Sequence, residues 1–257
     1  MNNTLPEGPV LVTGATGTIG WHIASQLAGQ SHDVRVLVRD RARAGEILPS
    51  GVTLVQGDLS DPDSLPPALD GIQTVFHAAG LPEQWLADPT VFDKVNAEGT
   101  RALATAALRA GVTSFVHTST IDVLAKTSGT PFDESSLETR PLGTAYQRSK
   151  QKADNIVVEL IEAGLPARFT HPSALFGTSP SHSPGMNDLL VDLAANKLPA
   201  LPPGGMPVVY APDVARGHIA AAPHPWARAT SSATATYPCP ILPQWSAKSC
   251  PRPGSPG

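Results

Sequence analysis

Two side chains that could move a proton stand one helical turn apart in the second half of the chain. Tyr146 and Lys150 lie in a stretch whose pattern predicts a helix over residues 143–163, and side chains at i and i+4 share one face of a helix. A phenol has an ordinary pKa of about 10, and a neighbouring ammonium favours the phenolate and lowers that pKa. We therefore expect Lys150 to lower the pKa of Tyr146, which would exchange a proton with a substrate oxygen.

A hydroxyl group that could orient this oxygen follows an apolar strand candidate at residues 115–118. Both Ser119 and Thr120 stand at this strand end, and the residues alone leave the choice open. Because a Tyr-x-x-x-Lys pattern also occurs on ordinary helix faces, its meaning depends on whether the chain can hold a cofactor beside it.

A glycine-rich turn near the start of the chain could hold that cofactor. It follows the apolar run at residues 10–12 and leads into a predicted helix at 18–29. Glycines at this spacing permit a tight turn, a close approach of the backbone to a pyrophosphate, and close packing of helix on strand. The first N–H groups of a helix lack partners within the helix and attract an anion. The alternative is a turn without a ligand. The expected dinucleotide contacts in this loop are Gly14, Thr16, Gly17, Thr18, Ile19 and Gly20.

The end of the second strand candidate indicates which dinucleotide would bind. Residues 34–38 end in Arg39 and Asp40. An arginine at this position accommodates the 2′-phosphate of NADP, whereas an acidic residue bonds the ribose hydroxyl of NAD. Arg39 favours NADP, and Asp40 keeps NAD possible. The alternative is a solvated basic stretch that opens the next helix.

Strand and helix patterns alternate along most of the chain, which predicts βαβ units. We expect an α/β fold with a doubly wound parallel sheet, whose ligands bind outside the carboxyl ends of the strands. The strand candidates are residues 10–13, 34–38, 52–56, 74–77, 115–118 and 167–170, and the helix candidates are 18–29, 88–110 and 143–163.

Composition argues against several other classes of protein. The chain has 257 residues, 41% of them hydrophobic, and a net charge of −4 from 18 basic and 22 acidic side chains without a basic patch. We expect no nucleic-acid partner, no membrane span and no signal peptide. The first 238 residues contain no cysteine, and the two cysteines are Cys239 and Cys250. We therefore expect neither a disulfide framework nor a metal cluster. A reducing cytoplasmic environment is expected.

The pattern changes after residue 177. Proline and glycine become frequent at residues 178–212, where a helix is predicted at 186–196, a strand at 208–210 and a helix at 213–220. From residue 223 the periodicity stops, and such composition buries little surface. We expect a dinucleotide-binding domain at 8–177, a partial substrate-binding lobe at 178–222 and an irregular tail at 223–257.

The chain resembles the extended short-chain dehydrogenase/reductase family, also called the NAD-dependent epimerase/dehydratase family. Around residues 34–40 it is similar to the dihydroflavonol-reductase-like branch, which uses NADP. The matching motifs are Thr13-Gly14-x-x-Gly17-x-x-Gly20, Gly57-Asp58-Leu59, His77-Ala78-Ala79-Gly80, Asn96-x-x-Gly99-Thr100, Ser119-Thr120 and Tyr146-x-x-x-Lys150.

The resemblance implies a Rossmann-type fold with a small, truncated C-terminal substrate lobe and a catalytic triad of Thr120, Tyr146 and Lys150. Serine is usual in this triad, and the register favours Thr120 over Ser119. The resemblance also implies a homodimer formed through a four-helix contact that includes the tyrosine-bearing helix. Further cofactor contacts expected from it are Asp58, Leu59, His77, Ala78, Ala79, Asn96, His171 and Pro172, beside Lys150 on the nicotinamide ribose. The alternatives are a turn or cap role for Asp58 and a structural role for His77.

Two departures from the family narrow the function. Ile121 and Asp122 stand where the dehydratase branch has an acidic pair, which argues against dehydration. His171-Pro172 replaces the usual Arg-Pro, which weakens nucleotide-sugar binding, and His171 either contacts substrate or packs.

We therefore expect an NADP-dependent oxidoreductase that transfers a hydride between nicotinamide and a small or medium ketone, aldehyde or alcohol. The alternatives are a nucleotide-sugar epimerase of the same family and a non-catalytic dinucleotide-binding regulatory protein. The expected substrate contacts are Glu83, Gln84, Trp85, Phe176 and Met186.

Overall fold

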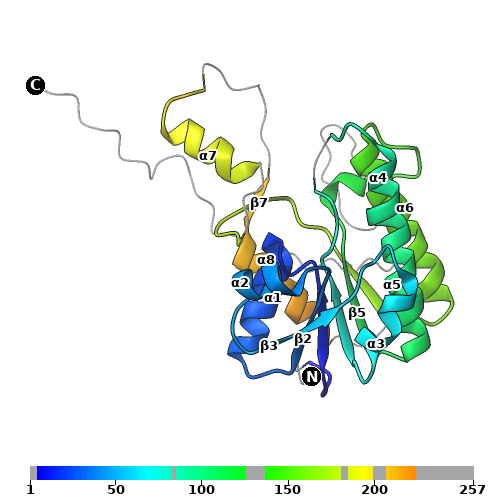
Figure 1. The fold of residues 1–257 in the computed structure, drawn as a ribbon. Helices are drawn as coiled ribbons and strands as arrows, with labels where there is room; N and C mark the ends of the chain where they lie inside the picture. Colours follow the sequence, from blue (N-terminus) through cyan, green and yellow to red (C-terminus); the bar gives the residue numbers. More distant parts are fainter. Residues whose placement is uncertain (1–4, 83–84, 126–136, 181–184, 199–206, 224–257) are drawn as a thin grey trace, which may run out of the picture.

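Six parallel strands form the central sheet of the protein (Figure 1). The computed structural model describes residues 5–82, 85–125, 137–180, 185–198 and 207–223. The strand order is β3-β2-β1-β4-β5-β6, so the doubly wound sheet expected from the sequence is confirmed. The strands are β1 (Val10–Thr13), β2 (Val34–Val38), β3 (Val52–Gln56), β4 (Thr74–His77), β5 (Ser114–Thr118) and β6 (Ala167–Thr170).

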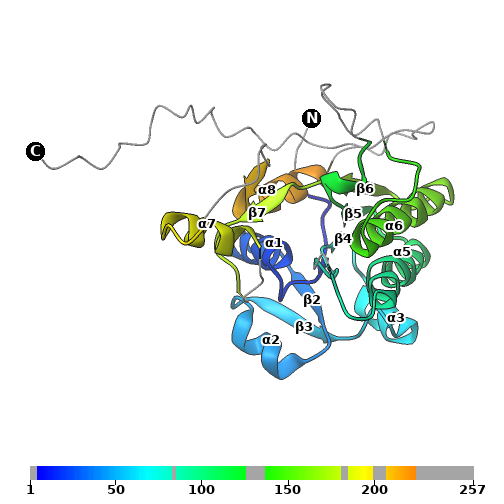
Figure 2. The same cartoon turned by 90° about the horizontal axis from the view of Figure 1, so that it is seen from above.

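Helices cover both faces of this sheet, as the view from above shows (Figure 2). One face carries α1 (Thr18–Gly29) and α8 (Ala211–Ala221), and the other carries α3 (Leu65–Leu69), α5 (Gly99–Ala110) and α6 (Ala145–Glu162). Two apolar cores fill the layers, with Phe76 on the α1 side and Phe115 on the α5 side, both fully buried. Each buried side chain of this size contributes about 1.5–3 kcal/mol to folding.

The strand order reverses between β1 and β4, where the chain leaves the two strands in opposite directions. Thr13 and His77 are paired at this end of the sheet. Gly14 follows β1 with φ +71°, and a Cβ there would lie 2.5 Å from the Ala79 nitrogen. Only glycine therefore lets the two loops pass each other at the switch point, where ligands of such sheets bind.

The start of α6 is set by a capping box. The Thr144 hydroxyl accepts the Gln147 N–H at 3.1 Å, and the Gln147 side chain accepts the Thr144 N–H at 3.1 Å. These bonds satisfy two N–H groups that the helix itself leaves unpaired. They place Tyr146 in the first turn of α6 and Lys150 in the second.

The helix predicted over residues 88–110 contains a wider turn. It comprises α4 (Thr90–Phe92), a π-helical segment η2 (Asp93–Glu98) and then α5. The extent of the prediction is confirmed, but the sequence pattern did not indicate the π turn. Such turns are rare and frequently occur at functional sites. Here the π turn contains Asn96, whose side chain is buried.

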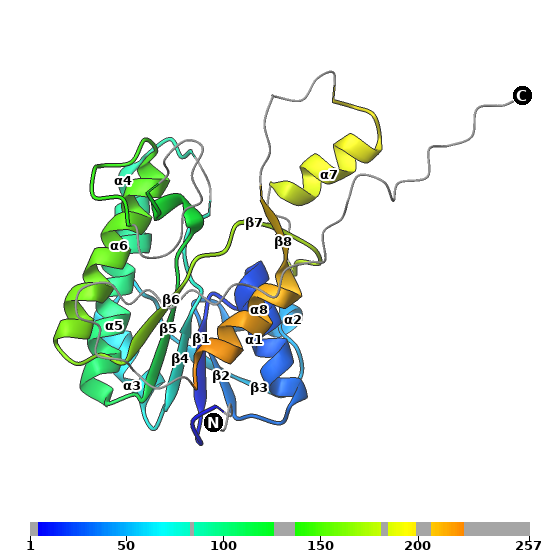
Figure 3. The same ribbon diagram turned by 180° about the vertical axis from the view of Figure 1, so that it is seen from behind.

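A smaller unit lies beyond the carboxyl ends of the sheet (Figure 3). It consists of β7 (Ala174–Phe176) paired in parallel with β8 (Val208–Tyr210), and of α7 (Met186–Ala194). The strand predicted at 208–210 is confirmed, and β7 was not predicted. Helix α7 ends two residues before its predicted end at 196, and α8 begins two residues before its predicted start at 213. The predicted irregular tail lies outside the described residues, except for Pro223.

Four shorter helical segments were not among the predicted helices. They are α2 (Arg41–Ile47), η1 (Pro62–Ser64), α3 and η3 (Ile121–Val123). Among the helices in the described part of the chain, none is long and apolar enough to cross a membrane.

Candidate functional site

A cleft of about 1710 Å³ runs along the carboxyl ends of the strands, between the sheet and the β7–β8 unit. It extends from the ends of β2 and β3, past the glycine loop, to the start of α6. Most of the residues predicted from the sequence as site residues line it. These are Gly14, Thr16, Gly17, Thr18, Ile19, Arg39, Asp58, Leu59, Ala78, Ala79, Thr120 and Tyr146.

The N-terminus of α1 forms the middle of this cleft and suits an anion. Gly17 is the N-cap residue, it makes no side-chain cap bond, and the first turn contains no acidic residue. A Cβ on Gly17 would approach only the Gly14 carbonyl oxygen, at 3.3 Å. The missing side chain therefore leaves room for a phosphate beside N–H groups that have no helical partner. Gly20 lies beneath the loop, where a Cβ would be 2.5 Å from the Gly14 oxygen.

A strap from the smaller unit is tied to this helix end. We use the name strap for residues 177–180, which follow β7. The hydroxyls of Thr18 and Ser179 are hydrogen-bonded at 2.8 Å. The His22 ring nitrogen Nε2 donates to the Thr178 carbonyl oxygen at 2.9 Å. The strap therefore closes one wall of the cleft beside the phosphate-binding loop.

The end of the cleft at β2 and β3 is basic. Arg39 and Arg43 are exposed and line it, together with Lys94 from the π turn. The Asp40 carboxylate caps α2 by accepting the Arg43 N–H at 3.1 Å, so one of its oxygens is already bonded. This arrangement leaves more positive than negative charge where an adenosine ribose would lie.

Asp58 forms a turn and also faces the cleft, and its contact with the cofactor stays a prediction. One of its carboxylate oxygens accepts both the N–H and the hydroxyl of Ser60, each at 2.9 Å. The backbone hydrogen bond from Ser60 is the main cause that lowers the pKa of Asp58. Asp58 thus shapes the turn after β3 and also lines the cleft.

The opposite end of the cleft holds Tyr146 and Thr120. The ring of Tyr146 packs edge-on against Phe92, with 6.3 Å between the ring centres. Thr120 caps η3 by accepting the Asp122 N–H at 3.2 Å, and its hydroxyl lies close enough to the Tyr146 phenol to lower the pKa of the phenol. A phenol and a second hydroxyl therefore lie together on the wall of the cleft. Proton donation to a carbonyl oxygen requires a group placed in this way.

The expectation that Lys150 lowers the pKa of Tyr146 is wrong for this arrangement. Burial is the main cause that raises the pKa of Tyr146 to about 12, and the Asp122 and Asp154 carboxylates raise it too. The Thr120 hydroxyl lowers this pKa. Tyr146 is therefore a neutral phenol near pH 7.

Lys150 lies one turn behind the phenol and does not line the cleft. Its ammonium donates to the Thr118 carbonyl oxygen at 2.7 Å. Burial lowers the pKa of Lys150, and the Asp154 carboxylate opposes that effect. In this arrangement Lys150 holds the end of β5, and its bond to a nicotinamide ribose stays a prediction.

The hydroxyls of Ser119 and Thr120, which follow β5, lie in different surroundings. Thr120 lines the cleft. The Ser119 hydroxyl donates to the buried Asp154 carboxylate at 2.7 Å. The geometry therefore favours Thr120 as the hydroxyl available to a substrate.

Two residues expected to touch the cofactor have side chains that join neighbouring loops. His77 is 1% exposed; its Nδ1 is bonded to the Thr13 hydroxyl and its Nε2 to the Thr100 hydroxyl, each at 2.8 Å. The Asn96 side chain accepts the Leu81 N–H at 2.7 Å. Both side chains therefore position the loop after β4 from the interior, and a contact of either residue with the cofactor stays a prediction.

His171 and Pro172 also lie outside the cleft lining. His171 is 6% exposed, and its Nε2 lies 3.5 Å from an Asp154 carboxylate oxygen. The Pro172 carbonyl oxygen accepts the Ile121 N–H at 3.2 Å. Of the two roles considered for His171, packing agrees with its burial, and the cofactor contacts of this pair stay predictions.

The expected substrate contacts divide into three groups. Phe176 and Met186 line the cleft. Trp85 is 77% exposed and does not line it. Glu83 and Gln84 lie outside the described residues.

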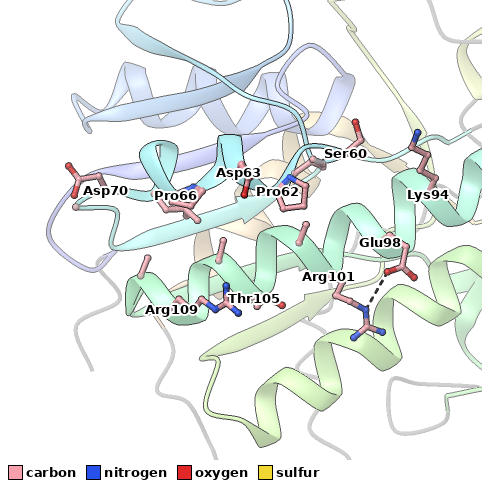
Figure 4. Close-up of a pocket in the computed structure, with 16 residues that line it drawn as sticks. Ser60, Pro62, Asp63, Pro66, Asp70, Lys94, Glu98, Arg101, Thr105 and Arg109 are labelled. Carbon is pink, nitrogen blue, oxygen red and sulfur yellow. Dashed lines mark ion pairs between the residues drawn. The ribbon is translucent and has the colours of Figure 1, made fainter.

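A second hollow, of about 840 Å³, lies between α3 and α5, away from the glycine loop and Tyr146 (Figure 4). Its wall carries both signs of charge, and Arg101 is paired with Glu98 at 3.4 Å. The hollow contains no proton-transfer group of the cleft, so we do not assign the chemistry to it. Among the described residues, no cluster of histidine, cysteine, aspartate or glutamate is arranged to hold a metal ion.

Three features of the site were not predicted from the sequence. They are the strap, the cleft-lining position of Gln147 and the buried Asp154. Asp154 could have been found, since it continues the four-residue spacing of Tyr146 and Lys150. The strap could not, because its contacts join residues more than 150 positions apart.

The fold and this cleft define a nucleotide-binding protein of the Rossmann type. The family model described as "NAD dependent epimerase/dehydratase family" matches residues 10–232. The chain belongs to this family.

Individual relatives differ in what they are named for. A Synechocystis sp. protein provisionally named dihydroflavonol 4-reductase is 29% identical over 225 residues, which are 87% of this chain and 64% of that protein. UDP-glucose 4-epimerase of Neisseria gonorrhoeae is 30% identical over 82% of this chain and 72% of its own length. The crystal structure of the dTDP-glucose 4,6-dehydratase DesIV from Streptomyces venezuelae, which has NAD bound, is 27% identical with a TM-score of 0.69, over 82% of this chain and 70% of its own. The chain thus spans less than two thirds of the length of the Synechocystis relative.

Proposed function

We propose that the protein is an NADP-dependent oxidoreductase that transfers a hydride between nicotinamide and a small or medium ketone, aldehyde or alcohol. The observation that carries the proposal is one continuous cleft with a glycine-capped helix end in its middle and the Tyr146–Thr120 pair at one end. A bound nicotinamide would supply the hydride. The chain's own groups supply the proton and hold the reacting oxygen.

Tyr146 suits the direction of carbonyl reduction. With a pKa of about 12 it is protonated near pH 7, so it can donate a proton to an oxygen that gains negative charge. The Thr120 hydroxyl, which lines the cleft beside the phenol, can orient the same oxygen. Oxidation of an alcohol needs the phenolate and should therefore be faster at high pH.

The basic end of the cleft supports NADP over NAD. A 2′-phosphate would find Arg39 and Arg43 on the cleft wall, and the nearest acidic group, Asp40, already accepts a backbone N–H. Arginine binds phosphate well because its planar guanidinium can donate two parallel hydrogen bonds.

The charges in the cleft also bear on the alternative of a nucleotide-sugar epimerase, which the relationship to UDP-glucose 4-epimerase raises. The only basic side chains of the described lining are Arg39, Arg43 and Lys94, all near the ends of β2 and β3. The rest of the described lining carries no basic side chain, and its charged members are Asp122 and Asp188. A nucleotide sugar carries a diphosphate, so this distribution favours an uncharged carbonyl substrate.

A panel of aldehydes, ketones and nucleotide sugars tests the proposal, with oxidation of NADPH followed by absorbance. We expect reduction of uncharged carbonyl compounds and no epimerisation. The variant Tyr146→Phe should lose about 10²–10⁴-fold in kcat, because it lacks the proton donor, and should bind NADPH normally. Full turnover by Tyr146→Phe would remove the phenol from the mechanism. Turnover of a nucleotide sugar without net NADPH consumption would favour the epimerase.

Two further expectations accompany this function. A homodimer through a four-helix contact that includes α6 stays a prediction, which sedimentation of the purified protein would check. A cytoplasmic location likewise stays a prediction.

A further inference from the structure

A buried carboxylate stands one turn beyond Lys150 on α6. Asp154 is 2% exposed and follows Tyr146 and Lys150 at successive four-residue steps, so the three side chains share one face of the helix. Asp154 does not line the cleft. The role assigned to Tyr146 in the proposed function makes no use of Asp154.

Three side chains from the sheet converge on this carboxylate. Ser119 donates its hydroxyl at 2.7 Å, the His117 Nε2 lies at 3.1 Å, and the His171 Nε2 lies at 3.5 Å. Ser119 directly precedes Thr120. The carboxylate therefore joins α6 to the strand end that carries the cleft hydroxyl.

The charge of Asp154 is matched by Lys150. The pKa of His117 is lowered by burial, so this ring is neutral near pH 7. The hydrogen bond from His117 and the nearby His171 ring hold the pKa of Asp154 below its usual range, against the effect of burial. Asp154 is therefore ionised. Its negative charge favours the ammonium form of Lys150, and a buried charge without such a partner is costly.

We propose that Asp154 is a positioning residue of the proton-transfer site: it anchors the Ser119–Thr120 strand end to α6 and supplies the buried negative charge that balances Lys150. This inference rests on the proposed function for its kinetic consequences. Its electrostatic consequence can be measured without turnover.

The sign of the effect follows from the charges that face Tyr146 and Lys150. From α6, Asp154 raises the pKa of both groups, and from η3, Asp122 raises that of Tyr146. Replacing Asp154 by asparagine removes one of these negative charges and keeps a hydrogen-bond acceptor for Ser119. Both pKa values should then fall, and the phenol should ionise at lower pH.

Two variants separate charge from anchoring. Asp154→Asn removes the charge, and Ser119→Ala removes the hydroxyl bond while the charge stays. Glu159→Gln is the matched control, since it makes the same change from carboxylate to amide on α6, at an exposed ion pair with Arg101 of α5. The kcat for carbonyl reduction is measured against pH, together with the dissociation constant of NADPH.

For Asp154→Asn we expect the decline of kcat at high pH to move to lower pH by about one unit, with NADPH affinity within about threefold of wild type. For Ser119→Ala we expect an approximately tenfold lower kcat without a shift in the pH profile. Glu159→Gln should match wild type. A slower Asp154→Asn enzyme with an unshifted profile, or wild-type kinetics in both variants, would overturn the inference.

A titration without substrate separates this inference from the proposed function. Phenolate absorbance is recorded against pH for each protein, and the curve of the corresponding Tyr146→Phe variant is subtracted. The Tyr146 midpoint should be lower in Asp154→Asn than in wild type, even if no carbonyl compound is reduced. An unchanged midpoint would overturn the inference while leaving the proposed function standing. If Asp154→Asn does not fold, Ser119→Ala decides, because wild-type kcat in that variant would remove the anchor.

Discussion

Replacing Arg39 by alanine should convert a preference for NADPH into near indifference between the two cofactors. Arg39 is exposed at the cleft wall, so its attraction for a phosphate is weakened by water. Two unit charges about 4 Å apart attract by ~1 kcal/mol in water and ~4 kcal/mol near a protein surface. A hydrogen bond to a charged group contributes about 1.5–3 kcal/mol. We expect a loss of ~1.4–2.7 kcal/mol, which is about 10–100-fold in the dissociation constant of NADPH.

The assay is a titration of each protein with NADPH and with NADH, at low and at high salt. NADH affinity should change by less than about twofold, and the difference between the cofactors should shrink at high ionic strength because salt screens exposed charges. Arg41→Ala is the control, since Arg41 is exposed two residues further along, at the start of α2, but does not line the cleft. Equal losses for both cofactors in Arg39→Ala, or an equal effect of Arg41→Ala, would refute the 2′-phosphate role.

Two further predictions concern stability. Gly20→Ala should lower the melting temperature by about 2–8 °C, because its Cβ would lie 2.5 Å from the Gly14 oxygen and overpacking costs about 1–3 kcal/mol. Gly29→Ala, at the open end of the same helix, should not lower it. Equal melting temperatures of the two variants would contradict the packing argument. Burial lowers the pKa of His218 to about 4, so the unfolded chain binds this proton more readily, and stability should be constant above about pH 7 and fall between about pH 6.5 and 4. Denaturant unfolding of His218→Gln should show a shallower decline over this range, and a wild-type stability that does not change there would contradict the assignment.

Most strands of the central sheet could be predicted from the sequence because they are buried on both faces, whereas the edge strand β3 is only partly buried. The apolar runs at residues 10–13, 34–38, 52–56, 74–77 and 167–170 coincide with the observed strands, since such runs need no partner to be recognised. Strand β7 was missed because Ala174–Phe176 is short and only partly buried. Its pairing with β8 depends on residues more than 30 positions away, which a local pattern does not contain.

The site was predictable where backbone geometry dictates the residue. Gly14 and Gly20 are required by close contacts, so their spacing carries information about the fold. His77 and His171 show the opposite case, since a histidine at a strand end can face either the cleft or the interior. The neutral state of Tyr146 depends on the burial of the ring and on the Asp122 carboxylate. Neither follows from the presence of a lysine four residues away.

The first two turns of α1 hold the strap and also face the cleft. Thr18 and His22 hold Ser179 and Thr178, while the same helix end faces the cleft where phosphates would bind. Phe176, which lines the cleft, directly precedes the strap. A displacement of this helix end would therefore move both the glycine loop and the strap beside Phe176. Thermodynamic linkage requires that any effect of the cofactor on substrate affinity be matched by an equal effect of the substrate on cofactor affinity, and these two hydrogen bonds directly connect the two parts of the cleft.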